Sequence, residues 1–246
     1  MIALYLGRGA VSYHSDTQGA LAAYTRVTEL DPSHMEGHNR RGHLLHRLGD
    51  LPAAQDAYEK ALSLADTQND PSGKAAALGN LGIVAQVRGN LDAAEGFHTQ
   101  ALGLHTELGR KEGMAIQYGT LGIVAQKRGD SDAAEGFLIQ ALGLHTELGH
   151  KEGMAANHGN LGIVEMIRGD LDAAEGFYNQ ALELNKILGR KEGMANQYSN
   201  LGGLEKTWGN LKAAWDYLIK ARDLYDAIGM PHMVEKTQGW LDDLGP

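Results

Sequence analysis

Histidine side chains are the first residues of this sequence whose type and spacing could support chemistry. The chain has eleven histidines. His34 and His38 are four residues apart, and His43 and His46 are three apart, so each pair would share one face of a helix. There is no cysteine and no His-Glu-x-x-His motif. The histidines are also interspersed with arginines, whose charge opposes a bound cation: Arg40, Arg41 and Arg47. The pattern favours a basic surface patch over a metal site.

Acidic side chains are the second candidates. A hydrolase with paired carboxylates needs two acids about 5 to 10 Å apart in one pocket. The recurring glutamates instead fall on helices whose outer surface we expect to face water: Glu95, Glu107, Glu135, Glu147 and Glu175. Gly7-Arg8-Gly9 is too short for a phosphate-binding loop and follows no strand. The sequence therefore predicts no catalytic residue, no metal ligand and no cofactor, and we expect the protein not to be an enzyme.

Composition and charge narrow the class of partner. The chain has 246 residues, of which 43% are hydrophobic and 22% charged, as in ordinary folded proteins. With 31 acids against 22 bases it lacks the excess of Lys and Arg that nucleic-acid binding requires. Residues 1–13 do not resemble a signal peptide, and no stretch approaches 18 apolar residues. We expect a cytoplasmic protein that binds no nucleic acid and does not insert into membranes.

A period of 40 residues organises the chain. The segment Ala75–Met114 matches Ala115–Met154 at 30 of 40 positions. The same spacing separates glycines along most of the sequence: Gly49, Gly89, Gly129, Gly169 and Gly209. Such a period is the mark of a repeat architecture. We expect one domain over 1–246, with repeats at about 1–34, 35–74, 75–114, 115–154, 155–194 and 195–230.

Each repeat is predicted to form two helices. From Lys111 to Arg128, apolar residues recur at steps of three and four, which marks one face of a helix. Gly129 can adopt a left-handed conformation and end that helix, and Asp130 is a natural N-cap for the next one, over residues 131–148. The connection is so short that the helices must form an antiparallel hairpin. One hairpin cannot bury its own apolar faces, so the repeats must stack into a solenoid.

These features resemble the tetratricopeptide repeat family. The residues that carry the resemblance are a Leu-Gly pair, a glycine turn and spaced small and aromatic residues: Leu81-Gly82, Gly89-Asn90, Ala94, Phe97 and Ala101. The 40-residue form is similar to the repeats of kinesin light chains and G-protein-signalling modulators. The resemblance implies an all-α fold, an α/α superhelix of about six helix-turn-helix repeats. The family's closing proline is present in the first unit, at Pro32, and absent from the 40-residue units.

Residues 231–244 carry the apolar stripe of one more helix. Leu241 stands 40 residues after Leu201, so we expect an unpaired first helix that caps the last hairpin. Trp208 and Trp215 would then pack against it. An alternative is that these two tryptophans form a docking surface.

The resemblance also implies a binding face. In the family, first helices line a concave groove, and the residue two before the Leu-Gly glycine points into it. Here Asn80, Asn160 and Asn200 would form a ladder of amides that bonds the backbone of an extended peptide. The glycines Gly79, Gly119 and Gly159 would leave the groove floor unobstructed. The full predicted set is Arg40, His43, Arg47, Asn80, Ile83, Thr120, Ile123, Gln126, Asn160, Ile163 and Asn200. Alternatively, the asparagines merely bond neighbouring helices.

The sequence thus predicts a protein-interaction scaffold that holds an extended segment of a protein partner. The alternative is a regulatory sensor module whose superhelix responds to a small peptide or ligand. Self-association stays open.

Overall fold

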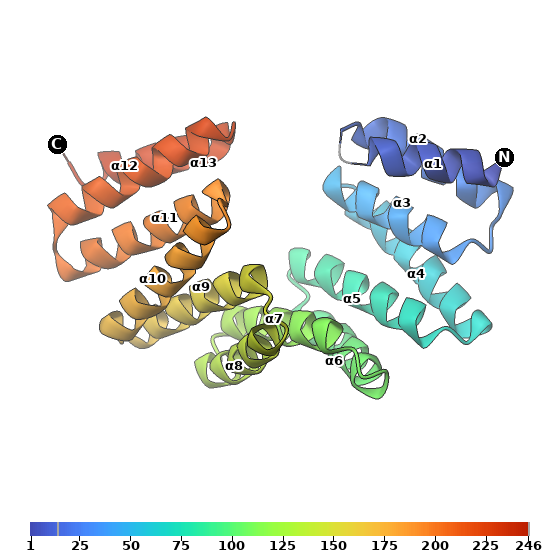
Figure 1. Cartoon of the computed structure of the whole chain (residues 1–246), viewed down its shortest axis with the longest axis horizontal. Coiled ribbons are helices and arrows are strands. Elements are labelled where there is room, and N and C mark those ends of the chain that lie inside the picture. The colour runs from blue at the N-terminus through green and yellow to red at the C-terminus, as the bar shows by residue number, and fades with distance from the viewer. Residues whose placement is uncertain (14, 246) are drawn as a thin grey trace. The chain divides into compact units, whose positions relative to one another are not determined.

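The computed structural model describes residues 1–13 and 15–245, and within them the chain forms thirteen α-helices and no β-strand (Figure 1). This confirms the expected all-α fold of six helical hairpins followed by one more helix. In chain order the helices are α1 (Ile2–Ser12), α2 (Thr17–Leu30), α3 (Met35–Arg47), α4 (Leu51–Gln68), α5 (Pro71–Val87), α6 (Leu91–Glu107), α7 (Lys111–Arg128), α8 (Ser131–Glu147), α9 (Lys151–Arg168), α10 (Leu171–Ile187), α11 (Lys191–Trp208), α12 (Leu211–Ala227) and α13 (Pro231–Asp242).

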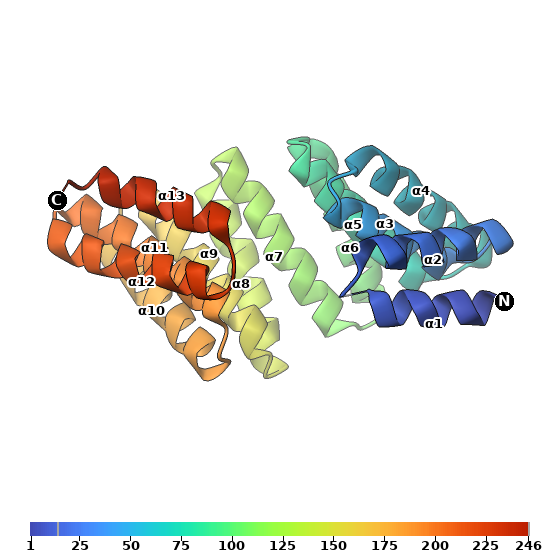
Figure 2. The same cartoon turned by 90° about the horizontal axis from the view of Figure 1, so that it is seen from above.

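The helices group into two compact units, Met1–Gln117 and Tyr118–Pro246. In the first unit each helix from α1 to α6 packs on the next one in the chain, and in the second unit the same holds from α8 to α13 (Figures 1 and 2). First helices of neighbouring hairpins also touch, α3 with α5 and α9 with α11. Each unit is therefore a stack of hairpins, as repeats that cannot bury their own apolar faces require.

Local chemistry sets the ends of the helices. The side chains of Asp50, Asp130 and Asp170 each accept a hydrogen bond from the backbone N–H three residues later, which satisfies a free donor of the helix that follows. Gly129 adopts a φ of 81°, and the other turn glycines of the 40-residue period are also left-handed. Asn69 takes the same region with a φ of 53°. The predicted caps and turns are confirmed.

The glycine of the Leu-Gly pair lies where the second helix of the hairpin approaches the first closely. A Cβ added to Gly82 would lie 2.6 Å from the ring of His98, and one added to Gly122 would lie 2.7 Å from Cγ of Leu138. Phe97, the aromatic residue of the repeat pattern, is half-buried and precedes the His98 that faces Gly82. His98 is four residues after Ala94, so both lie on the buried face of α6.

The helix predicted from Lys111 to Arg128 is α7, and α3 begins at Met35, where one of the repeats was expected to begin. The helices α5, α7, α9 and α11 each begin four residues before the repeat boundary expected near them. At the end of the second unit, α13 buries Thr237 and Leu241. Its Met233 and Val234 pack on a cluster that contains Tyr225 of α12. The thirteenth helix therefore covers the last hairpin through Tyr225. Among the described residues, none of the helices combines the length and the apolar character needed to span a bilayer.

Candidate peptide-binding face

The second unit has an uncharged strip on a first helix. Ala156, Asn160, Ile163 and Ile167 follow one another along α9 at steps of four, three and four residues, so they lie on one side of the helix. Ile167 is 59% exposed, whereas Ile163 is half-buried against the cluster that includes Tyr178. We call these four residues the α9 strip. It offers apolar surface around one amide, which is the composition that the sequence predicted for the groove.

Two asparagines of the second unit that were predicted to lie in the groove make few hydrogen bonds. Asn160 is half-buried and makes no hydrogen bond within the described part of the chain. Asn200, its counterpart on α11, donates only a long bond of 3.4 Å to Oε1 of Gln197 on its own helix. Neither amide joins two helices. Their donor and acceptor groups are therefore free to bond an added backbone.

Asn80 in the first unit behaves differently. Its Nδ2 donates to Oδ1 of Asn39 at 2.8 Å and lies 3.4 Å from Nε2 of His43, so the amide joins α5 to α3. This is the inter-helix bond that the alternative interpretation expects. Ile83, one turn further along α5, is 37% exposed. Two of the predicted residues, His43 and Asn80, thus meet in the first unit, but the Nδ2 donor of Asn80 is already used.

The predicted basic residues of α3 are also engaged. Nε of Arg40 donates to Oε1 of Glu36 at 2.5 Å, and Nη1 of Arg47 donates to the carbonyl of Tyr13 at 2.6 Å. Both guanidinium groups lie within 6 Å of the Tyr13 ring, as cation–π contacts do. Burial, with a smaller effect from Arg40, lowers the pKa of His43 below its usual value. These arginines hold the chain around Tyr13 against α3.

The three predicted residues of α7 lie on a half-buried surface of the second unit: Thr120, Ile123 and Gln126. The Nε2 atom of Gln126 is buried and has no hydrogen-bond partner among the described residues. Its Nε2 is therefore not available to a ligand in this conformation.

The prediction that glycines form an open groove floor is wrong for Gly79 and Gly159. Gly159 is buried, and a Cβ added there would lie 3.0 Å from Nε2 of Gln197 on the next first helix. Gly79 faces Gln117 in the same way, at 3.1 Å. First helices pack so closely that these glycines make room for the buried amide of the following repeat. Amide side chains recur at this position every 40 residues. Their residue type alone does not predict that they pack against a glycine of the preceding repeat.

Two of the four histidines, His34 and His38, have structural roles and do not belong to the predicted surface patch. Nδ1 of His34 accepts the backbone N–H of Gly37 at 2.9 Å and so caps the helix. His38 is 8% exposed and its Nε2 lies 3.1 Å from the carbonyl of Pro32. Across the described residues, no group of three or more acidic or histidine side chains is arranged to hold a metal ion.

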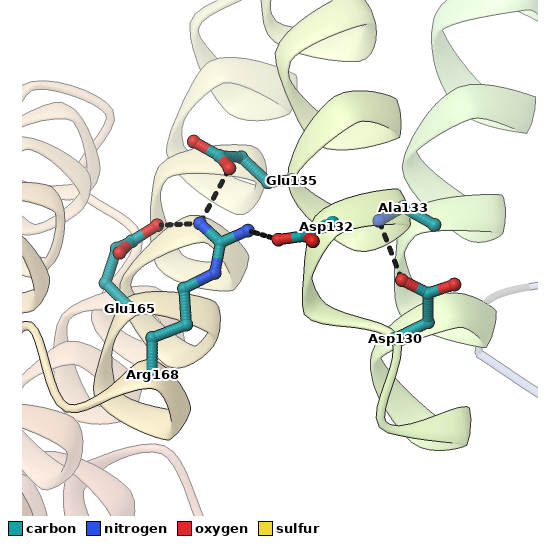
Figure 3. Close-up of polar contacts among 6 residues, drawn as sticks. All are labelled: Asp130, Asp132, Ala133, Glu135, Glu165 and Arg168. Carbon is teal, nitrogen blue, oxygen red and sulfur yellow. Dashed lines mark hydrogen bonds and ion pairs between the residues drawn. The ribbon is translucent and has the colours of Figure 1, made fainter.

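A cluster of salt bridges around one arginine was not predicted from the sequence. Arg168, the last residue of α9, reaches back to α8, where Nη2 is 2.5 Å from Asp132 and Nη1 is 2.6 Å from Glu135 (Figure 3). Glu165 on α9 lies 3.0 Å from Nη1. These partners, Glu135 first, raise the pKa of Arg168. The prediction that Glu135 faces water is therefore wrong, because its carboxylate pairs with Arg168 of the next repeat.

A signal for this cluster is present in the sequence. Arginine is the last residue of a first helix, or directly follows it, at Arg88, Arg128 and Arg168, and the acidic pair recurs as Asp132/Glu135 and Asp172/Glu175. Arg168 and its acidic partners on α8 are 33 and 36 residues apart in the sequence. Their contact can be predicted only if neighbouring repeats are assumed to stack. At the next position of the series the arginine is replaced by Trp208.

Known proteins share both the repeat and the fold. The profile of the Tetratricopeptide repeat family matches residues 34–107, 73–147, 113–187 and 153–227. The chain is 45% identical over 60 residues to the heat shock protein sti1 homolog of Schizosaccharomyces pombe, a match that covers 24% of this chain and 10% of that protein.

Solved structures agree with the fold. BtubC from P. vanneervenii is similar with a TM-score of 0.71 at 22% identity, covering 92% of each chain. The apo form of RapI has a TM-score of 0.74 at 13% identity, covering 99% of this chain and 97% of that one. A Rap protein complexed with competence and sporulation factor has a TM-score of 0.72 at 13% identity, covering 99% and 74%. The profile spans most of the sequence, and the structure supplies the matching stacked hairpins. The chain is a member of the tetratricopeptide repeat family.

Proposed function

We propose that the protein is an interaction scaffold and that the exposed side of its first helices binds an extended segment of a protein partner. The observation that carries this is the α9 strip, where exposed Ile167 and half-buried Ile163 flank the uncommitted amide of Asn160. An extended peptide needs donors and acceptors for its backbone and apolar contact for its side chains, and this strip offers both. We expect no catalysis, because proteins of this family typically act as scaffolds, and we expect a cytoplasmic location.

Asn160 and Asn200 are the residues that we expect to bond the bound backbone. Replacing either by Ala would leave a peptide group of the partner unpaired, which costs on the order of 1 kcal/mol in binding. The two residues lie on different helices, so their effects should nearly add. Because neither side chain joins two helices, stability should hardly change. Asn80→Ala should instead lower stability, since it removes the bond to Asn39.

The test is affinity capture from the native host, in which bound proteins are identified and their affinities then measured with the purified chain. The wild type is compared with Asn160→Ala and Asn200→Ala, and each variant is also melted. Asn179→Ala is the matched control, because Asn179 is exposed on α10, a second helix of the same unit. Lower melting temperatures with unchanged partner affinity in the two first-helix variants would refute the proposal.

A sensor module remains the second candidate. A Rap protein with a similar fold has been solved in complex with competence and sporulation factor, and RapI, which also has a similar fold, has been solved in its apo form. A ligand that acts by shifting conformation must bind two states with different affinity. The proposal of a sensor therefore predicts that a bound peptide changes the hydrogen-exchange protection of helices that it does not touch. Protection limited to the α9 strip and its neighbours favours the scaffold.

A further inference from the structure

Trp208 stands where the three preceding repeats have an arginine, and this changes one surface hollow of the second unit, which we call the Trp208 notch. In the preceding repeat this position is Arg168, whose guanidinium binds Asp132, Glu135 and Glu165. The equivalent acids one repeat later are Asp172, Glu175 and Glu205. An indole stands at the end of α11 in place of the guanidinium, and it lines a hollow together with Asp172. The three carboxylates therefore lack the arginine that their counterparts bind.

The acids around Trp208 have no ion-pair partner in the described part of the second unit. Asp172 is exposed, and Glu175 is half-buried. Glu205 accepts only the neutral amide of Asn210, at 2.9 Å. Carboxylates gathered without a counter-charge favour the approach of a cation, since each opposite charge within a few ångströms stabilises the ionised acid.

The indole itself is accessible and borders a hollow. Trp208 is 36% exposed. With the turn after α9 and the first turn of α10, it lines a hollow of about 520 Å³, whose polar wall includes Asp170 and Asp172. Arg168 also lines this hollow, but its charge is balanced by the acids of the preceding repeat. An aromatic face beside uncompensated carboxylates is a recurrent arrangement for binding cations.

We propose that this notch binds an arginine side chain of a partner polypeptide, with the guanidinium against the Trp208 indole and paired with Asp172. A guanidinium fits better than an ammonium because it is planar, stacks on aromatic rings and bonds carboxylates through two parallel N–H groups. The chain itself gives the precedent, because Arg168 occupies the equivalent acids one repeat earlier (Figure 3). The site lies at the turns between helices and is distinct from the α9 strip.

The probe is a blocked Gly-Arg-Gly tripeptide, titrated into the full chain while the indole N–H signals are followed by NMR. The protein has three tryptophans. We expect a saturable shift of the Trp208 signal, assigned with Trp208→Phe, and no shift of Trp240, whose ring already carries Lys236 at 5.1 Å. Asp172→Asn should weaken binding about fivefold, the loss of one exposed charged contact. Asp226→Asn, a distant exposed acid on α12, should leave it unchanged.

A repair variant separates the site from a general charge effect. Trp208→Arg should supply the missing guanidinium, abolish the response of this region to the tripeptide and raise the melting temperature. Peptides with lysine or uncharged citrulline in place of arginine should bind at least severalfold more weakly. Equal binding of the arginine and citrulline peptides, equal binding of arginine and lysine, or undiminished binding to Trp208→Arg would each overturn the proposal.

Discussion

Two glycines of one hairpin should respond in opposite directions to the same added methyl group. Gly122 on α7 faces Leu138, and Gly136 on α8 has no atom within 4 Å of the place where a Cβ would stand. Both lie inside helices. In a helix, Ala is intrinsically favoured over Gly by about 0.5–1 kcal/mol, because Gly loses more freedom on folding. The comparison therefore isolates the effect of packing.

At Gly122 the added methyl would stand 2.7 Å from Cγ and 2.9 Å from Cδ2 of Leu138, and 3.3 Å from the carbonyl oxygen of Ala134. Since the first two distances are far below van der Waals contact, α7 and α8 must move apart or Leu138 must leave its rotamer. Overpacking of this kind costs about 1–3 kcal/mol, which exceeds the gain in helix propensity. We expect Gly122→Ala to lower the free energy of unfolding. We expect Gly136→Ala to raise it by about 0.5–1 kcal/mol.

Urea unfolding followed by circular dichroism measures both changes as shifts of the midpoint at constant slope. A third variant tests the cause. Leu138→Ala removes the side chain that the new methyl meets, so the double variant with Gly122→Ala should be less unstable than the sum of the two single changes. Equal midpoints for Gly122→Ala and Gly136→Ala, or strictly additive effects in the double variant, would refute the packing argument.

Three further outcomes follow from the same contacts. Burial lowers the pKa of His98 below 6.5, so the unfolded chain binds a proton first as the pH falls, and the stability should decrease as the pH falls below about 6.5; His98→Leu should lessen that decrease in acid unfolding curves, and an unchanged curve would contradict this. Arg168→Ala should lower the melting temperature more at low salt than at high salt, because its partners are charged; salt-independent loss would argue against an electrostatic role. Deletion of residues 155–194, one whole period, should leave a shorter chain with unchanged ellipticity per residue, since stacked repeats add nearly locally; a disordered product would contradict this.

Much of the fold could be predicted from the sequence because its determinants are local. The 40-residue period, the left-handed turn at Gly129 and the cap at Asp130 all depend on residues within a few positions of one another. Such short-range rules fix where a helix begins and ends, and their repetition along the chain predicts stacked hairpins. The tetratricopeptide resemblance rests on the same local pattern.

The tertiary structure decided how side chains behave between repeats. Asn80 and Asn160 occupy equivalent positions, yet Asn80 is tied to Asn39 while Asn160 is uncommitted, because the neighbour across the helix interface differs. Likewise Arg168 finds its acids only through residues 33 and 36 positions away. Spacing along the chain determines which face of a helix a side chain occupies. The partner of that side chain is set by the packing of the neighbouring repeat, so a single residue difference there decides whether a polar group is hydrogen-bonded.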